Sequence, residues 1–123
     1  MKNRILTSIV LSIAAFCLWA EDPSVVIPTP KDTNYALYPA PTGVFLRLDT
    51  RDGTIIGIVP NNPKKSRMLN PNPLASDNKA GRFTLYPTEY GWDWILFDTT
   101  TGETWLLKWS AKHDILTKIN LEI

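Results

Sequence analysis

Tyr35-Ala-Leu-Tyr-Pro39 leads into Phe45-Leu-Arg-Leu-Asp49-Thr-Arg-Asp-Gly53, and the pattern returns as Phe83-Thr-Leu-Tyr-Pro87 followed by Trp94-Ile-Leu-Phe-Asp98-Thr-Thr-Thr-Gly102. Aligning Tyr35 with Phe83 gives an offset of 48 residues, whereas Gly53 and Gly102 lie 49 apart, so one insertion separates the copies. A repeat of this length is one supersecondary unit that needs a neighbour to bury its apolar face. The duplication therefore predicts two tandem units, repeat one at 35–59 and repeat two at 83–110.

Each repeat has the alternation of apolar and polar residues that is typical of β-strands. In repeat one, Val44, Leu46 and Leu48 alternate with Phe45, Arg47 and Asp49, and a period of two places alternate side chains on one face of a strand. Three strands are predicted in this repeat, at about 35–38, 44–50 and 54–59, and repeat two follows the same rule.

A turn at the same place in each repeat predicts a β-hairpin. Asp49 and Gly53 bound the first turn, and Asp98 and Gly102 bound the second. A type I turn followed by a glycine with positive φ fits both, with the aspartate accepting hydrogen bonds from amides of the turn. These four residues are therefore predicted to have a structural role.

A three-residue turn of this kind also fixes which residues pair across each hairpin. It pairs Leu48 with Ile56 and Leu46 with Ile58, which gives one continuous apolar face. In repeat two it places Trp105 and Trp109 on the core face. The pairs expected there are Phe97 with Trp105, Ile95 with Leu107, Leu96 with Leu106, and Trp94 with Lys108.

Two further segments complete the predicted fold. The connection 60–82 is polar and contains several prolines, with a local charge of +4, and an irregular loop of this length is often functional or disordered. Residues 115–123 alternate regularly and predict a terminal strand that pairs with a sheet edge. The fold class is all-β: two tandem three-stranded hairpin repeats plus a C-terminal strand, in a small sandwich or barrel-like sheet.

The N-terminal residues 1–20 have the features of an export signal. Lys2 and Arg4 precede an apolar run from Ile5 to Leu18, which is too short to span a bilayer as a helix, and the small residue Ala20 follows. Cleavage there predicts an exported protein, periplasmic or secreted. Lipid anchoring at Cys17 is the less favoured alternative, because the bulky Phe16 directly precedes it.

The chain beyond residue 20 has 103 residues, enough for one small domain. Residues 21–34 form a proline-rich leader, and 35–123 a single β domain. This part contains no cysteine, so its stability has to come from its core, and no membrane-spanning segment is expected in it. Its 11 basic and 12 acidic residues leave a net charge near −1, which argues against nucleic acid as a partner.

Catalytic, metal and cofactor sites find little support in the sequence. His113 is the only histidine, and no serine lies in a nucleophile-elbow motif. Asp49 and Asp98 suggest calcium, but one or two carboxylates per turn are few for an ion that takes six to eight oxygen ligands. No catalytic residue, metal site or cofactor is therefore predicted.

Aromatic residues give the best indication of function. All four tryptophans beyond the signal lie within the 18 residues from Trp92 to Trp109. The expected register places Trp94 and Trp92 on the face opposite the core, with Tyr90 and Lys108 nearby. If that face is open, it could stack on sugar rings or anchor a protein partner; if it is covered, these residues belong to the core.

Two resemblances follow from these motifs. Repeat two resembles a pattern in small exported proteins of Bacteroidetes whose function is uncharacterised. The residues that carry the resemblance are Tyr86-Pro-Thr, Trp92, the segment Trp94-Ile-Leu-Phe-Asp98-Thr, Gly102, Trp105 and Trp109. This resemblance implies a β-hairpin module outside the cytoplasm. Phe97-Asp98, Thr101-Gly102 and Trp105 are also similar to the repeat of quinoprotein-type β-propellers, although two repeats cannot close a propeller within one chain.

Three hypotheses of function follow from the sequence. The preferred one is an exported, non-enzymatic module that binds a glycan or an envelope protein through the aromatic face of repeat two, with Trp92, Trp94, Tyr90 and Lys108 as its site. The second is a structural or inhibitory protein that docks on another envelope protein by a sheet edge or by the 60–82 loop. The third is a hydrolase that uses His113 together with an acid.

Overall fold

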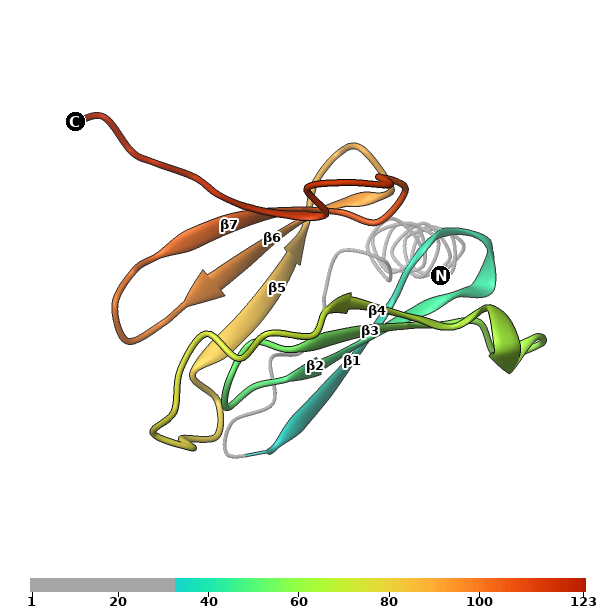
Figure 1. The fold of residues 1–123 in the computed structure, drawn as a ribbon, viewed down its shortest axis with the longest axis horizontal. Helices are drawn as coiled ribbons and strands as arrows, with labels where there is room; N and C mark the ends of the chain where they lie inside the picture. The colour runs from blue at the N-terminus through green and yellow to red at the C-terminus, as the bar shows by residue number, and fades with distance from the viewer. Residues whose placement is uncertain (1–32) are drawn as a thin grey trace, which may run out of the picture.

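The computed structural model describes residues 33–123, which form eight strands in two four-stranded antiparallel sheets. Each sheet follows chain order, and Figure 1 shows the two sheets lying one over the other. The all-β prediction is confirmed, as a small sandwich. The first sheet contains β1 (Tyr35–Pro39), β2 (Phe45–Asp49), β3 (Ile55–Ile58) and β4 (Arg67–Asn70). The second contains β5 (Phe83–Pro87), β6 (Asp93–Asp98), β7 (Thr104–Lys108) and β8 (Leu116–Lys118).

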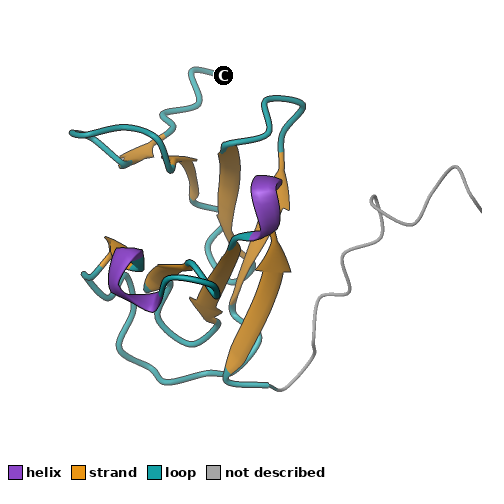
Figure 2. Cartoon of the chain, turned by 90° about the vertical axis from the view of Figure 1, so that its right-hand side faces the viewer, coloured by secondary structure: helices purple, strands orange, loops and turns teal. Residues whose placement is uncertain are grey.

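The helical elements among residues 33–123 are two short 3-10 turns, η1 (Pro41–Gly43) and η2 (Pro63–Lys65), which Figure 2 shows beside the strands. No helix among residues 33–123 is long and apolar enough to cross a membrane. The predicted signal 1–20, with Cys17, and most of the leader 21–34 lie outside the described residues.

The connection 60–82 is more ordered than the sequence indicated, because β4 lies within it and pairs with β3. The buried side chain of Asn70 fixes the end of β4 by donating to the carbonyl of Gly53 at 2.9 Å. The terminal strand pairs with the edge of the second sheet as expected, but β8 has only three residues. The prediction of a strand over 115–123 was therefore too long, and the last residues form the extended tail in Figure 1.

Both hairpin turns are one residue longer than expected. The amide of Asp49 donates to the carbonyl of Thr54 at 2.9 Å, so four residues rather than three lie between the paired residues that close the turn, and Asp98 pairs with Glu103 in the same way. Gly53 and Gly102 have the predicted positive φ, at 82° and 79°. The carboxylate of Asp49 accepts from the amide of Arg51 at 3.0 Å, which is the kind of hydrogen bond expected of an aspartate that braces a turn.

The longer turn shifts the register of both hairpins by one residue, so the expected pairings were wrong. Leu48 lies opposite Ile55 instead of Ile56, and Trp94 lies opposite Leu107 instead of Lys108. A shift of one residue moves the side chains of one strand to the other face. In repeat one, β3 therefore turns Ile55 and Gly57 to the core; in repeat two, β6 buries Trp94 and Leu96 there.

The core lies between the two sheets and contains aromatic contacts. Tyr38 is fully buried, and its ring meets that of Trp94 edge-on with the centroids 5.9 Å apart. The Tyr38 hydroxyl accepts from the amide of Leu85 at 3.4 Å and lies 3.4 Å from the hydroxyl of Thr84. Phe83 packs on Trp105 at a centroid distance of 6.3 Å, as expected for a core residue at position 105.

Equivalent positions of the two repeats lie on opposite sides of their sheets, which is visible when Tyr38 is aligned with Tyr86 and Asp49 with Asp98. We call the side of each sheet that faces the core its inner face, and the other side its outer face. The inner face of the first sheet contains Ala36, Tyr38, Leu46, Leu48, Ile55 and Gly57. The residues equivalent to the last five, Tyr86, Ile95, Phe97, Thr104 and Leu106, belong to the outer face of the second sheet, whereas Thr84, the equivalent of Ala36, is buried beside the Tyr38 hydroxyl. The inner face of the second sheet contains Leu85, Trp94, Leu96, Trp105 and Leu107, and the equivalent residues Leu37, Phe45, Arg47, Ile56 and Ile58 belong to the outer face of the first. The repeats are therefore stacked head to tail, with the front of one unit against the back of the next.

Candidate functional site

The four residues predicted to bind a ligand do not form one surface. Trp94 is only 2% exposed, because β6 turns its side chain into the core. The expectation that Trp94 lies on the face opposite the core was therefore wrong. Lys108 is exposed at the end of β7, where it lies opposite Asp93. The expected pairing of Lys108 with Trp94 is therefore wrong, because Trp94 lies opposite Leu107.

Trp92 and Trp109 form a second aromatic contact at the end of the sandwich. Their rings meet edge-on at a centroid distance of 5.6 Å, and the Trp109 amide donates to the Trp92 carbonyl at 3.1 Å. Trp109 also lies over Gly57, where an added Cβ would be 2.6 Å from the indole. Both tryptophans are partly buried, so these contacts give them a packing role. Tyr90 stands apart in the turn before β6 and is 68% exposed.

Asp98 and Asp49 are held by arginine side chains as well as by amides. Arg82 contacts both carboxylate oxygens of Asp98, at 3.0 and 2.9 Å, and Arg51 does the same to Asp49 at 2.9 and 2.8 Å. Burial alone would raise the pKa of Asp98, but the hydrogen bonds from Arg82 and the turn amides outweigh it and lower the pKa to about 2. The pKa of Asp49 is likewise lowered, because the bonds from Arg51 outweigh burial.

These ion pairs leave little for a cation, because the carboxylate oxygens are already occupied by donors. Within the described part of the chain, no group of three or more His, Cys, Asp or Glu side chains could hold a metal ion. The turn residues are best understood as structural.

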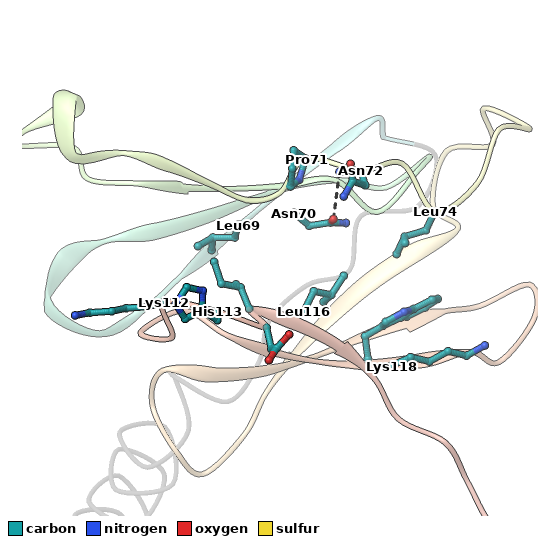
Figure 3. A pocket seen from close by; sticks show the side chains of 12 residues that line it. Leu69, Asn70, Pro71, Asn72, Leu74, Lys112, His113, Leu116 and Lys118 are labelled. Atoms are coloured by element: carbon teal, nitrogen blue, oxygen red, sulfur yellow. Dashed lines mark hydrogen bonds between the residues drawn. The ribbon is translucent and has the colours of Figure 1, made fainter.

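A groove of about 470 Å³ lies between the β4 and β8 edges of the sandwich. Figure 3 shows Leu69, Asn70 and Asn72 on one side of it and His113, Leu116 and Lys118 on the other. His113 has Asp114 as its neighbour in the lining, but no serine, threonine or cysteine lines this groove. A nucleophile within reach of the histidine is what a hydrolytic triad requires. The geometry therefore gives no support to the hydrolase hypothesis.

The outer face of the second sheet is one apolar surface of the sandwich. Tyr86, Ile95 and Leu106 lie in register across β5, β6 and β7. Phe97 lies on the same face, one pair further along the hairpin, with Thr104 beside it. Tyr86 is 50% exposed and the other four are partly exposed. Sequence reasoning assigned Ile95 and Phe97 to the core, and the alternation held no signal against this, because both faces of β6 are apolar.

The outer face of the first sheet is a second apolar surface, with a more basic character. Leu37, Arg47, Ile56 and Met68 lie in register across its four strands. Leu37 is 58% exposed and Met68 is 47% exposed, so both have open surface. The guanidinium of Arg47 lies 5.4 Å from the centroid of the Tyr35 ring, which is a cation–π contact.

No protein-family model matches this chain, and no similar protein was found among curated proteins or solved structures.

Proposed function

We propose that this chain is a non-enzymatic interaction module that binds a protein partner through the outer face of its second sheet. The observation that carries the proposal is the row of Tyr86, Ile95 and Leu106, which joins three strands in one partly exposed apolar surface. Contiguous apolar surface on a small domain is typical of a docking site. Aromatic and aliphatic side chains at its centre supply the contacts on which such interfaces depend.

A protein fits this surface better than a glycan does. Sugar rings stack on flat, open aromatic faces, and neither Trp94 nor the Trp92–Trp109 pair offers one. Tyr86 is the aromatic residue of the outer face that has half of its surface open. Ile95 and Leu106 have no polar groups with which to bind sugar hydroxyls. We therefore favour the protein partner over the glycan that the sequence left open.

The proposal includes export from the cytoplasm. Lys2, Arg4 and the apolar run before Ala20 support an export signal, and the resemblance to small exported proteins of Bacteroidetes agrees with it. The partner would then be a protein that is itself present in the cell envelope or in the surrounding medium. Localisation of the chain by cell fractionation, with and without residues 1–20, tests this part directly.

Site-specific crosslinking in cells tests the docking surface. A photoreactive phenylalanine analogue replaces Tyr86 on the outer face or, as the matched control, Tyr90 in the exposed turn. We expect a discrete adduct of higher mass from position 86 and none from position 90. In the same cells, Leu106→Arg should remove the adduct at position 86 while the chain remains folded. No adduct at position 86, or equal adducts at both positions, would refute the docking surface.

A further inference from the structure

The head-to-tail stacking of the repeats has a consequence for the two outer faces. The outer face of the second sheet is equivalent to the inner face of the first sheet. The outer face of the first sheet is likewise equivalent to the inner face of the second sheet. The fold therefore already contains one junction between these two kinds of face, in its own core. We propose that the outer face of the second sheet in one copy binds the outer face of the first sheet in a second copy, so that the chain assembles head to tail. This inference rests on the proposed function and names its partner.

The aromatic contact at the centre of the internal junction has its counterpart between copies. Inside the chain, Tyr38 packs edge-on against Trp94. The equivalent residues are Tyr86 on the second sheet and Phe45 on the first. Tyr86 is 50% exposed and Phe45 is partly exposed, so each has free surface for the other. A tyrosine packed on an aromatic ring would thus recur at the junction between copies.

The edge amides of the strands support the same junction. Within the chain, β5 uses two amides to bind the first repeat. That of Phe83 donates to the Thr50 carbonyl at 2.8 Å, and that of Leu85 donates to the Tyr38 hydroxyl at 3.4 Å. β1 is likewise the first strand of its sheet and pairs only with β2. The equivalent amides, those of Tyr35 and Leu37, lie on its other edge. Between copies their acceptors would be the Thr99 carbonyl and the Tyr86 hydroxyl.

The sizes of the side chains are complementary at both junctions. Inside the chain, Gly57 leaves space that the indole of Trp109 fills. The equivalent residues are Leu106 in place of the glycine and Pro60 in place of the tryptophan. Inside the chain the first sheet supplies the small residue and the second sheet the large one, whereas between copies the second sheet supplies the larger residue, Leu106, and the first sheet the smaller one, Pro60. This exchange allows a similar spacing of the sheets without a void.

One position differs in chemistry and predicts a weaker contact. Arg47 on the outer face of the first sheet is equivalent to Leu96, which is fully buried in the internal core. A guanidinium must keep its polar partners when an interface forms, because burying an unpaired charge is costly. We therefore expect a reversible assembly in place of an obligate one. Since the two contacting faces are different surfaces, repeated contacts would close a ring or extend as a fibre.

Sedimentation and light scattering over a wide range of concentrations test the assembly, using the full chain in the form that the producing cell releases. Two variants each block one face: Tyr86→Arg on the second sheet and Leu37→Asp on the first. Both side chains are at least half exposed, so the fold should tolerate the changes. We expect concentration-dependent association of the unaltered chain, and a loss of roughly tenfold or more in affinity for each variant alone.

Mixing the two variants gives the sharpest test. Each retains one intact face, so the mixture should form a one-to-one heterodimer and no larger species. Tyr90→Arg is the control and should assemble like the unaltered chain. Monomers at every concentration would overturn the inference, as would association that survives Leu37→Asp but not Tyr86→Arg, which would indicate contact between two second sheets. A crosslinked adduct at position 86 with a different protein, together with a monomeric purified chain, would refute self-assembly and leave the docking surface standing.

Discussion

Replacing Trp94 tests the register of the fold most directly, because the expected register places this residue on the face opposite the core and the structure places it in the core. Trp94 is 2% exposed and its ring packs on that of Tyr38. Truncating a buried tryptophan to alanine costs about 3–5 kcal/mol, which includes the cavity left behind. A small domain has only about 5–15 kcal/mol of total stability. Trp94→Ala should therefore lower the melting temperature by about 20 °C or leave the chain unfolded.

Trp94→Phe separates the loss of volume from the loss of polarity. The indole nitrogen of Trp94 is buried and makes no hydrogen bond with any described residue, and a buried donor without a partner costs about 1–3 kcal/mol. Phenylalanine removes that donor while retaining an aromatic ring, so Trp94→Phe should cost much less than Trp94→Ala. Urea unfolding, followed by circular dichroism, measures both free energies.

Trp92→Ala is the matched control, because Trp92 is partly exposed at the end of the sandwich. Its cost should be smaller than that of Trp94→Ala. A Trp94→Ala variant with unchanged stability would refute the packing described above and restore the register expected from the alternation. An order of costs in which Trp92→Ala exceeds Trp94→Ala would count against it as well.

Three further predictions concern packing and turns. Gly57→Ala should destabilise the domain by about 1–3 kcal/mol through overpacking, and Trp109→Leu in the same chain should recover part of that loss in a double-mutant cycle. Gly53→Ala should cost more than Gly102→Ala in urea unfolding: both glycines have positive φ, but a Cβ at position 53 would be 3.0 Å from the nearest side chain, whereas position 102 is open. The Asp98 pKa of about 2 lies below the ordinary 3.8, so this group stabilises the fold fully above about pH 4. About 2 kcal/mol should be lost as pH falls through about 2, a loss that Asp98→Asn removes from acid titrations followed by circular dichroism.

Each of these predictions has an outcome that contradicts it. Equal costs of Gly57→Ala with and without Trp109→Leu would show that the two positions are not coupled. Equal costs at positions 53 and 102 would mean that the backbone conformation alone sets the penalty. An unchanged acid transition in Asp98→Asn would assign the acid sensitivity to other carboxylates.

The repeats, the strands β1 to β3 and β5 to β7, and the turn glycines could be predicted from the sequence because they depend on local alternation and backbone sterics. The register could not. In β3, Ile55 and Ile56 are adjacent, so either can face the core, and the choice depends on a single residue of turn length. In β6, Trp94 and Leu96 on one face are as apolar as Ile95 and Phe97 on the other. Periodicity cannot distinguish two apolar faces, and only the packing of one sheet on the other decides between them.

The strand β4 illustrates a signal that was present but weak. Arg67 to Asn70 is short and lies among polar residues and prolines, and it has no alternation of its own to indicate a strand. The pairing of Met68 with Ile56 is equivalent to that of Lys118 with Trp105, so β4 corresponds to β8. Extending the repeat to a fourth strand would have predicted it. Trp94 was misplaced for a different reason, since its burial depends on which face of the second sheet the first sheet covers.

The order of the strands also determines how the chain can be divided. Every strand pair joins neighbours in sequence, so each sheet is built from one continuous half of the described chain. Contacts of that kind form early and fast, whereas the joining of the two halves is a step between distant parts of the sequence. Cutting the chain between β4 and β5 would therefore leave two pieces that each keep all their strand partners. Such pieces are the starting material of a split reporter, whose halves regain a common core only when they are brought together.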